Sequence, residues 1–273
     1  MKIWHGMENG GLPARLKALR MFPYFFSLPP ADRRPKTVDP LPVIECLRAF
    51  TVTVDRYYID PTPHNLNEIW NKGGPTKLLA LLVEAHVSSF ASDDGDGRSP
   101  AKRKISQPAS PKSSWSGISA AMELYMLSVL SMTDGGEPLE CRLLYRILLI
   151  MKQDITQYHY YLSGEQGRLG QSIWFWKVFV GALALAKSQY HHRVLGMKCV
   201  DCPGKKKMEK LYEWFCDRAR AWSIATGMTK WLDVEAVLVS VTWPVALPRG
   251  ENDHAASTWD TIITRYTQTR YRP

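Results

Sequence analysis

The sequence predicts an all-α protein: a multi-helix array or bundle with a buried central helix near residues 171–187. Three observations support this fold class. Apolar residues recur every three or four positions over long stretches, which is the spacing of one helix face. The run "IWFWKVFVGALALA" at 173–186 is apolar on every face, which is typical of a helix enclosed by other helices. The alternation of strands and helices that marks a parallel sheet is missing.

The N-terminal half divides into three segments by composition. Residues 1–42 are basic and proline-rich, and the prolines within 22–42 predict an extended connector. Residues 43–91 are expected to form an N-terminal helical part, in which 43–58 fits a helix or a strand and 75–90 begins with a proline in a favoured helix position. Residues 92–114 contain no aromatic residue, so this basic Ser/Pro-rich segment is predicted to be a disordered linker.

A helical regulatory domain is expected at 115–268. Its first helix carries the apolar stripe Ile118, Met122, Tyr125, Val129 and Met132. Pro138 is expected to open the second helix, whose predicted apolar face consists of Leu139, Leu143, Ile147 and Ile150. The central helix at 171–187 then follows a glycine-rich loop.

Three further helices complete the predicted domain. The first carries Met208, Leu211, Phe215, Arg218 and Trp222 at helical spacing, with Lys205–Lys207 at its start. The second carries Trp231, Val234, Leu238 and Val241, although the valines at 237, 239 and 241 also alternate as in a strand. The last is expected to run from Asn252 or Asp253, as N-cap, to about Tyr266.

Composition and charge restrict the class of protein. The chain has 273 residues and a net charge of +9, of which residues 1–40 carry +4 and residues 91–114 carry +2. Basic tails of this kind attract polyanions, so nonspecific nucleic-acid contact is one expectation and a solvated tail is the other. The longest apolar run is shorter than a membrane span and contains a lysine, so no membrane association is predicted. The N-terminus has no apolar signal-peptide region, and five cysteines is an odd number, which together favour a reduced intracellular compartment.

The stretch "KCVDCPGKKK" at 198–207 raises the question of a zinc site. Cys199 and Cys202 supply two ligands, and His191 with Cys216 could complete a set of four, but this spacing fits no established zinc motif. The alternative is a loop between two helices, closed by Pro203 and Gly204. A DNA-reading zinc binuclear cluster needs six cysteines in close succession, so the five scattered cysteines exclude one in this sequence.

No pattern for catalysis or cofactor binding is found. The carboxylates of "DDGDG" at 93–97 do not have the spacing of a calcium-binding loop. The glycines of "GEQGRLG" do not follow a strand, and nucleophile and metalloprotease motifs are missing. The expectation is therefore a protein that is not an enzyme and has no cofactor.

Four segments in the C-terminal half resemble a known family in their order: "IWFWKVFVGALALA", "LYEWFCDRARAW", "WLDVEAVLVSVTWP" and "STWDTI". Together they resemble the C-terminal part of the fungal-specific transcription factor regulatory domain, which usually follows a zinc binuclear cluster. The resemblance covers residues 115–266 and depends on the Trp/Phe-rich helix, the Trp214–Phe215 pair, and Trp231 with Trp243–Pro244. It implies a helical regulatory module without catalytic residues, located in the nucleus or the cytoplasm, that binds transcription-regulatory proteins, effectors or a second copy of itself. It also implies that 231–242 is helical.

Three expectations concern particular residues. Lys102, Arg103 and Lys104 form a short basic run of the kind that nuclear import receptors read, and Ser99 and Ser110, each before a proline, are candidate phosphorylation sites; the alternative is a featureless linker. Lys177, inside the apolar helix, should reach solvent or pair with a carboxylate. Trp174, Trp176, Phe179 and Trp231 are the expected walls of an effector pocket, with a fully packed core as the alternative.

Overall fold

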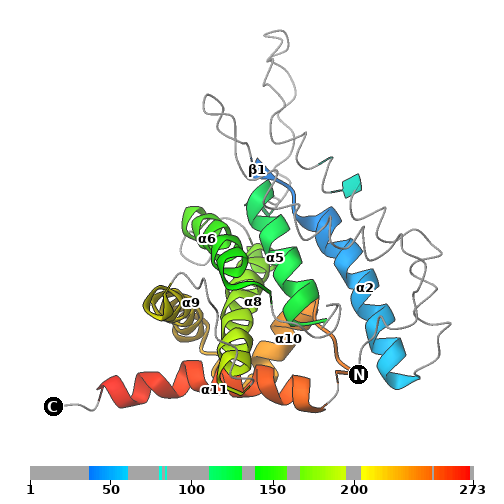
Figure 1. Ribbon diagram of the computed structural model, residues 1–273. Coiled ribbons are helices and arrows are strands. Elements are labelled where there is room, and N and C mark those ends of the chain that lie inside the picture. Colours follow the sequence, from blue (N-terminus) through cyan, green and yellow to red (C-terminus); the bar gives the residue numbers. More distant parts are fainter. Residues whose placement is uncertain are drawn as a thin grey trace, which may run out of the picture.

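The computed structural model describes residues 37–60, 80, 81, 84, 111–130, 139–158, 167–194, 204–247 and 249–270. In this part of the chain, seven helices with described bounds and two very short strands form an all-α array, which confirms the predicted fold class. Helix α8 (Gly167–Val194) runs through the middle of the array, as Figure 1 shows. It contacts α5 (Trp115–Ser128), α6 (Cys141–Gln157), α9 (Lys205–Thr226), α10 (Trp231–Val241) and α11 (Arg249–Arg270).

The predicted central helix is confirmed by the burial of α8. Its side chains from Ile173 to Leu185 are buried apart from Gly181, which has none, and they point to all sides of the helix. Within the described residues, Gly167–His191 is long and apolar enough to cross a membrane, with a mean hydropathy of 1.4 in its most apolar window. Since 78% of that window is buried inside the protein, the neighbouring helices already cover its apolar surface, as they do for the core helix of a soluble protein.

Gly181 allows the helices on either side of α8 to approach closely. A Cβ atom at this position would lie 2.5 Å from Met151 of α6 and 2.5 Å from Phe215 of α9. Any larger residue would push at least one of these helices away from α8. The glycine within the apolar run therefore marks the point where α6 and α9 both meet the central helix.

The ambiguous segment at 43–58 is a helix. Helix α2 (Leu41–Ile59) begins after Pro40, and its first turn contains Pro42, which suits a position that needs no amide donor. Its buried face packs in the same hydrophobic core as the C-terminal helices, and α2 lies against α5.

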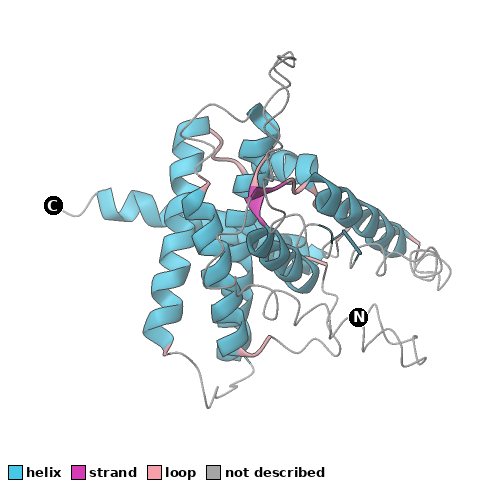
Figure 2. Ribbon diagram, turned by 90° about the horizontal axis from the view of Figure 1, so that it is seen from above, coloured by secondary structure: helices cyan, strands magenta, loops and turns pink. Residues whose placement is uncertain are grey.

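The predicted segment boundaries at 42 and 114 need correction. Strand β1 (Thr37–Val38) pairs in antiparallel register with β2 (Ser113–Ser114), which is the small magenta element in Figure 2. Residues 37–42 and 111–114 therefore belong to the folded part, because backbone pairing and burial of Ser113 hold them there. The rest of 1–42 and 92–114 lies outside the described residues, and the division into four segments stays a prediction.

The second helix of the predicted domain begins later than expected and buries a different face. Glu140, not Pro138, caps α6, and its carboxylate accepts hydrogen bonds from the amides of Arg142 and Leu143 at 2.9 Å each. Of the expected apolar stripe only Ile147 is buried, whereas Leu139, Leu143 and Ile150 are only partly buried. The buried face of α6 instead consists of Cys141, Leu144, Ile147, Leu148, Met151, Asp154 and Ile155.

The three C-terminal helices follow the predicted order. Helix α9 begins after Gly204, whose φ of 89° favours glycine. Of its predicted stripe, Met208, Leu211, Phe215 and Trp222 are buried, whereas Arg218 is only partly buried. Helix α10 settles the helix–strand ambiguity: Val234, Leu238 and Val241 are buried at helical spacing, whereas Val239 is exposed. Helix α11 begins at Arg249, ahead of the expected N-cap at Asn252 or Asp253.

Candidate functional site

The aromatic residues singled out as pocket walls meet in one cluster beside α8. The ring centroid of Phe179 lies 5.6 Å from that of Trp231, 5.7 Å from that of Trp243 and 6.2 Å from that of Trp259. Trp231 and Trp243 are themselves 6.4 Å apart. Side chains from α8, from both ends of α10 and from α11 therefore share a single contact region.

A second group of rings continues this cluster toward α9. Phe175, one turn before Phe179, stacks on Trp222 with a centroid distance of 3.7 Å and an interplanar angle of 16°. It also meets the edge of Trp259 at 6.0 Å. Together the two groups form the aromatic cluster, which consists of Phe175, Phe179, Trp222, Trp231, Trp243 and Trp259.

The other two expected wall residues bond to the backbone of neighbouring helices. The indole nitrogen of Trp174 donates to the carbonyl of Ile155 at 3.1 Å, and that of Trp176 donates to the carbonyl of Thr242 at 3.0 Å. Both tryptophans and Phe179 are fully buried, whereas Trp231 is partly exposed. The structure therefore brings Phe179 and Trp231 together and sends Trp174 and Trp176 to other sides of α8.

A buried hydroxyl cluster joins α2, α5 and the residue after α10. The Tyr125 hydroxyl lies 2.7 Å from the Thr51 hydroxyl and 3.2 Å from that of Thr242, and the two threonine oxygens are 2.9 Å apart. Tyr125 is fully buried, and this burial raises the pKa of its phenol far above the ordinary value. The phenol therefore stays protonated and takes part in a purely neutral network.

This burial predicts a loss of stability at alkaline pH. Above pH ~10 an unfolded tyrosine releases its proton, whereas Tyr125 keeps its proton in the folded state. Because the folded state then binds more protons, the free energy of unfolding falls as pH rises, by about 1.4 kcal/mol per pH unit for this group. In urea unfolding at a series of alkaline pH values, Tyr125→Phe should show a slope shallower by that amount. A Tyr125→Phe slope equal to that of the parent would show that this phenol does not keep its proton in the folded state.

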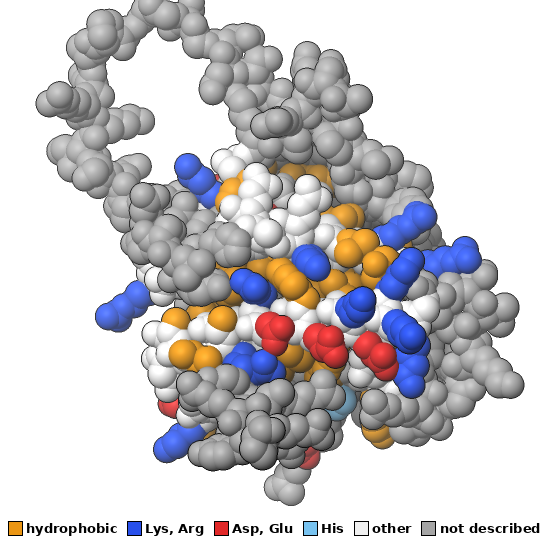
Figure 3. Space-filling model, turned by 90° about the vertical axis from the view of Figure 1, so that its left-hand side faces the viewer, with side chains coloured by type: hydrophobic (Ala, Val, Ile, Leu, Met, Phe, Trp, Pro, Cys, Tyr) orange, Lys and Arg blue, Asp and Glu red, His pale blue; other side chains and the backbone are white. Residues whose placement is uncertain are grey.

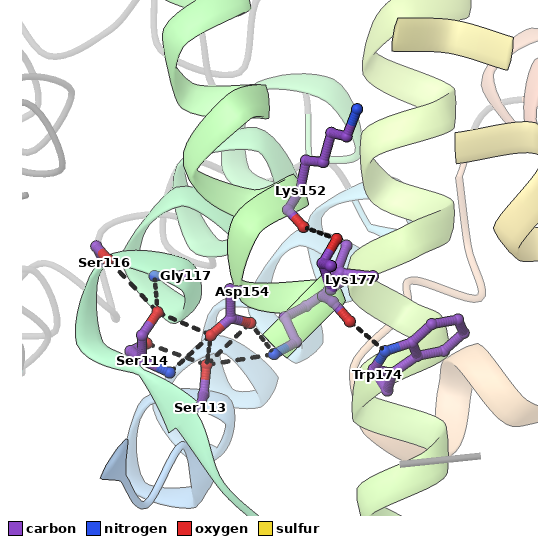
Figure 4. A network of polar contacts seen from close by, with 10 residues as sticks. Ser113, Ser114, Ser116, Gly117, Lys152, Asp154, Trp174 and Lys177 are labelled. Atoms are coloured by element: carbon purple, nitrogen blue, oxygen red, sulfur yellow. Dashed lines mark hydrogen bonds and ion pairs between the residues drawn. The ribbon is translucent and has the colours of Figure 1, made fainter. Parts of the chain in front are cut away.

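A buried ion pair joins α8 to α6, shown in Figure 4. The amine of Lys177 is 2.5 Å from a carboxylate oxygen of Asp154 on α6, and both side chains are 0% exposed. Asp154 also accepts from the amide of Ser114 at 2.6 Å and from its hydroxyl at 2.8 Å. Ser113 donates to Asp154 at 3.2 Å and accepts from Lys177 at 3.2 Å. The four residues form the Asp154–Lys177 network, which ties the end of β2 to α6 and α8.

Gly117 leaves room for the carboxylate of this network. A Cβ atom at Gly117 would overlap the carboxyl group of Asp154. The amide of Gly117 donates to the Ser114 hydroxyl at 3.0 Å, so Ser114 caps α5 while it also bonds to Asp154. The start of α5 and the burial of the ion pair therefore depend on the same residues.

The expected pairing of Lys177 with a carboxylate is confirmed, but the sequence did not identify Asp154 as the partner. The signal was present: Asp154 falls three residues after Met151 and one before Ile155, in line with the buried face of α6. A carboxylate at a core position of an amphipathic helix implies a buried cation. The stripe expected from the sequence ends at Ile150, one turn before Asp154.

The other candidate residues are not brought together by the described structure. His191 lies near the C-terminal end of α8 and is partly exposed, and Cys216 is buried in α9. Among the described residues, no group of three or more His, Cys, Asp or Glu side chains is placed to hold a metal ion. Cys199, Cys202, Ser99, Ser110 and the basic run at 102–104 lie outside the described residues.

The buried polar groups have mainly a structural role. In the Asp154–Lys177 network the ion pair and Ser113 are buried, and in the hydroxyl cluster all three hydroxyls are buried, so these groups bond to each other across helices. The aromatic cluster is mostly enclosed, with Trp231 at its edge.

No protein-family model, curated protein or solved structure matches this chain.

Proposed function

We propose that this chain is a regulatory or interaction module of a fungal-type transcription regulator, without a DNA-binding zinc cluster of its own. The observation that supports it is the convergence of the aromatic residues from which the resemblance was drawn. Phe179 of the Trp/Phe-rich helix contacts Trp231 and Trp243 of the "WLDVEAVLVSVTWP" segment and Trp259 of "STWDTI". Aromatic residues from three separate segments of the sequence therefore pack against one another in the folded protein.

A fusion to a heterologous DNA-binding domain tests the proposal. The full chain, tethered upstream of a reporter gene in yeast, should change reporter expression relative to the DNA-binding domain alone. Phe179→Ala, which removes the central ring of the aromatic cluster, should abolish the change, and Lys230→Ala, at an exposed position, should retain it. Equal reporter expression with and without the chain, at verified protein abundance, would contradict the proposed role.

A second candidate is a metal- or small-molecule-binding protein or enzyme that uses Cys199 and Cys202. The observation that favours it is the position of His191, which is partly exposed near the end of α8, in the segment that leads toward these cysteines. Metal analysis of the purified protein distinguishes the two functions. Stoichiometric zinc that is lost in Cys199→Ser would favour the second candidate.

Nuclear location is a prediction of the first function. Replacing Lys102, Arg103 and Lys104 with alanine should shift a fluorescently tagged chain from the nucleus toward the cytoplasm, because a short basic run is the feature that import receptors bind. Fluorescence microscopy measures the ratio between the compartments. Lys205, Lys206 and Lys207, the run of three at the start of α9, provide a matched control triple. If the variant at 102–104 is as nuclear as the parent, this basic run is not the import signal.

A further inference from the structure

Helices α6 and α9 form an exposed edge that combines basic and apolar side chains. On α9, Lys207, Lys210, Trp214 and Arg218 recur at helical spacing and share one edge of the helix. Across from them on α6, the amine of Lys152 lies 5.0 Å from the centroid of the Trp214 ring. Leu149, one turn before Lys152, is 40% exposed. These six residues are called the Trp214 strip.

Two cations lie near the ring of Trp214. Besides Lys152, the guanidinium carbon of Arg218 lies 5.7 Å from its ring centroid. One side of Trp214 packs against the core, but the residue is only partly buried, unlike Trp222 on the same helix. The indole therefore presents an apolar face at the surface, bordered by positive charge.

Arg218 supplies an independent observation. Its Nε atom is buried and has no hydrogen-bond partner among the described residues. The Arg218 side chain as a whole is only partly buried, and its terminal nitrogens are not among the buried donors that lack a partner, so these nitrogens can bind an acceptor on another molecule. A carboxylate is the acceptor that guanidinium groups bind best, because it offers two oxygens in matching geometry.

The charge of the surrounding surface is consistent with an acidic ligand. Figure 3 views the side of the molecule where α6 and α9 lie, and it shows Lys and Arg side chains on both sides of a band of hydrophobic side chains and a row of Asp and Glu side chains. Of the carboxylates on α9, Asp217 pairs with Arg220 at 2.8 Å and Glu209 lies 3.9 Å from Lys205. Both partners are outside the Trp214 strip, and among the described residues no ion pair joins Glu213 to a lysine of the strip.

We propose that the Trp214 strip binds an acidic peptide segment of a partner protein that also carries apolar side chains. The apolar side chains would cover Trp214 and Leu149, and the carboxylates would meet Lys152, Lys210 and Arg218. A nucleic acid fits less well. The row Glu209, Glu213 and Asp217 on α9 borders the strip and repels any anion, and a phosphate backbone carries a charge at every nucleotide. A peptide can place its carboxylates opposite the basic side chains and neutral residues opposite this row. The proposal names the partner class of the interaction function proposed above and rests on that function.

Fluorescence anisotropy with the purified full chain tests this proposal. The probes are a labelled peptide of alternating Asp/Glu and Leu/Phe residues, the same peptide with Asn/Gln in place of the acids, and a labelled DNA duplex. The acidic peptide should bind, and Lys152→Glu and Lys210→Glu should each weaken it about tenfold, because like charges would then face each other. Lys230→Glu, an equal charge change at the exposed residue before α10, should leave binding unchanged, and circular dichroism should show parent helicity for all variants.

Each other outcome overturns the proposal. If the acidic peptide does not bind, or if the Asn/Gln peptide binds equally well, the strip does not recognise acidic residues. Equal weakening by Lys230→Glu places the contact elsewhere, and DNA binding that depends on Lys152 and Lys210 in place of peptide binding makes the strip a nucleic-acid site. The reporter assay does not use these peptides, so failure here and failure of the proposed function are distinguishable.

Discussion

Asp154→Ala is expected to lower the free energy of unfolding by about 3–5 kcal/mol, because it leaves the charge of Lys177 buried without its counter-ion. Lys177 is 0% exposed and lies in the middle of α8, so its amine cannot reach water without a movement of the helix. The substitution also removes the acceptor for the amide and hydroxyl of Ser114. Urea unfolding followed by circular dichroism measures the change.

The reciprocal substitution should be less costly. In Lys177→Met, Asp154 still accepts hydrogen bonds from Ser113, from the Ser114 amide and from the Ser114 hydroxyl, and methionine fills much of the lysine volume. The double variant Asp154→Leu with Lys177→Met should recover part of the stability lost in Asp154→Ala, because no charge is then buried. A loss from Asp154→Ala no larger than that from Lys177→Met would show that the carboxylate does not organise this network.

Phe179→Ala is expected to cost a similar amount, about 3–5 kcal/mol, through the cavity it leaves. The ring of Phe179 contacts those of Phe175, Trp231, Trp243 and Trp259, so four neighbours lose packing at once. These neighbours are held on α8, on α10, on the segment after α10 and on α11, and they cannot all close into the space. Reversible urea unfolding gives the change in free energy, and near-ultraviolet circular dichroism should report altered tryptophan environments.

An exposed apolar residue provides the control for this prediction. Leu232 of α10 is 74% exposed, so Leu232→Ala removes a side chain that buries little surface. Its expected effect is within about 0.5 kcal/mol. A loss below ~1 kcal/mol for Phe179→Ala would show that α8 is not the core of the array and would contradict the architecture.

Helical periodicity is predictable where one face is apolar and the opposite face is charged. The stripe of α9 has this property. Helix α8 does not, but apolar residues on every face predict a helix enclosed by others, and α8 is buried in this way. The face of α6 was misassigned by one position. Leucine or isoleucine occupies 143, 144, 147, 148, 149 and 150, so several apolar stripes can be drawn through this helix, and only the packing against α5 and α8 selects one.

The start of a helix depends on local chemistry that the sequence offers in more than one place. Near α6 both Pro138 and Glu140 are residues that can begin a helix. The helix begins after Glu140, because its carboxylate accepts hydrogen bonds from two backbone amides. Near α2 and β2, short polar segments next to prolines were predicted to lie outside the fold. Residues 111–114 are ordered because Ser113 and Ser114 bond to Asp154, which lies 40 residues along the chain from Ser114.

The amino-acid sequence by itself determined the helical class, the order of the helices and the burial of 173–185, because these follow from composition and short-range periodicity. Only the tertiary structure decided which carboxylate neutralises Lys177, which rings meet Phe179 and which cations flank Trp214. These are contacts between separate helices, and their partners are selected by how the helices pack around α8. A periodic pattern shows which face of a helix is buried, but it carries no information about which residue of another helix lies against that face.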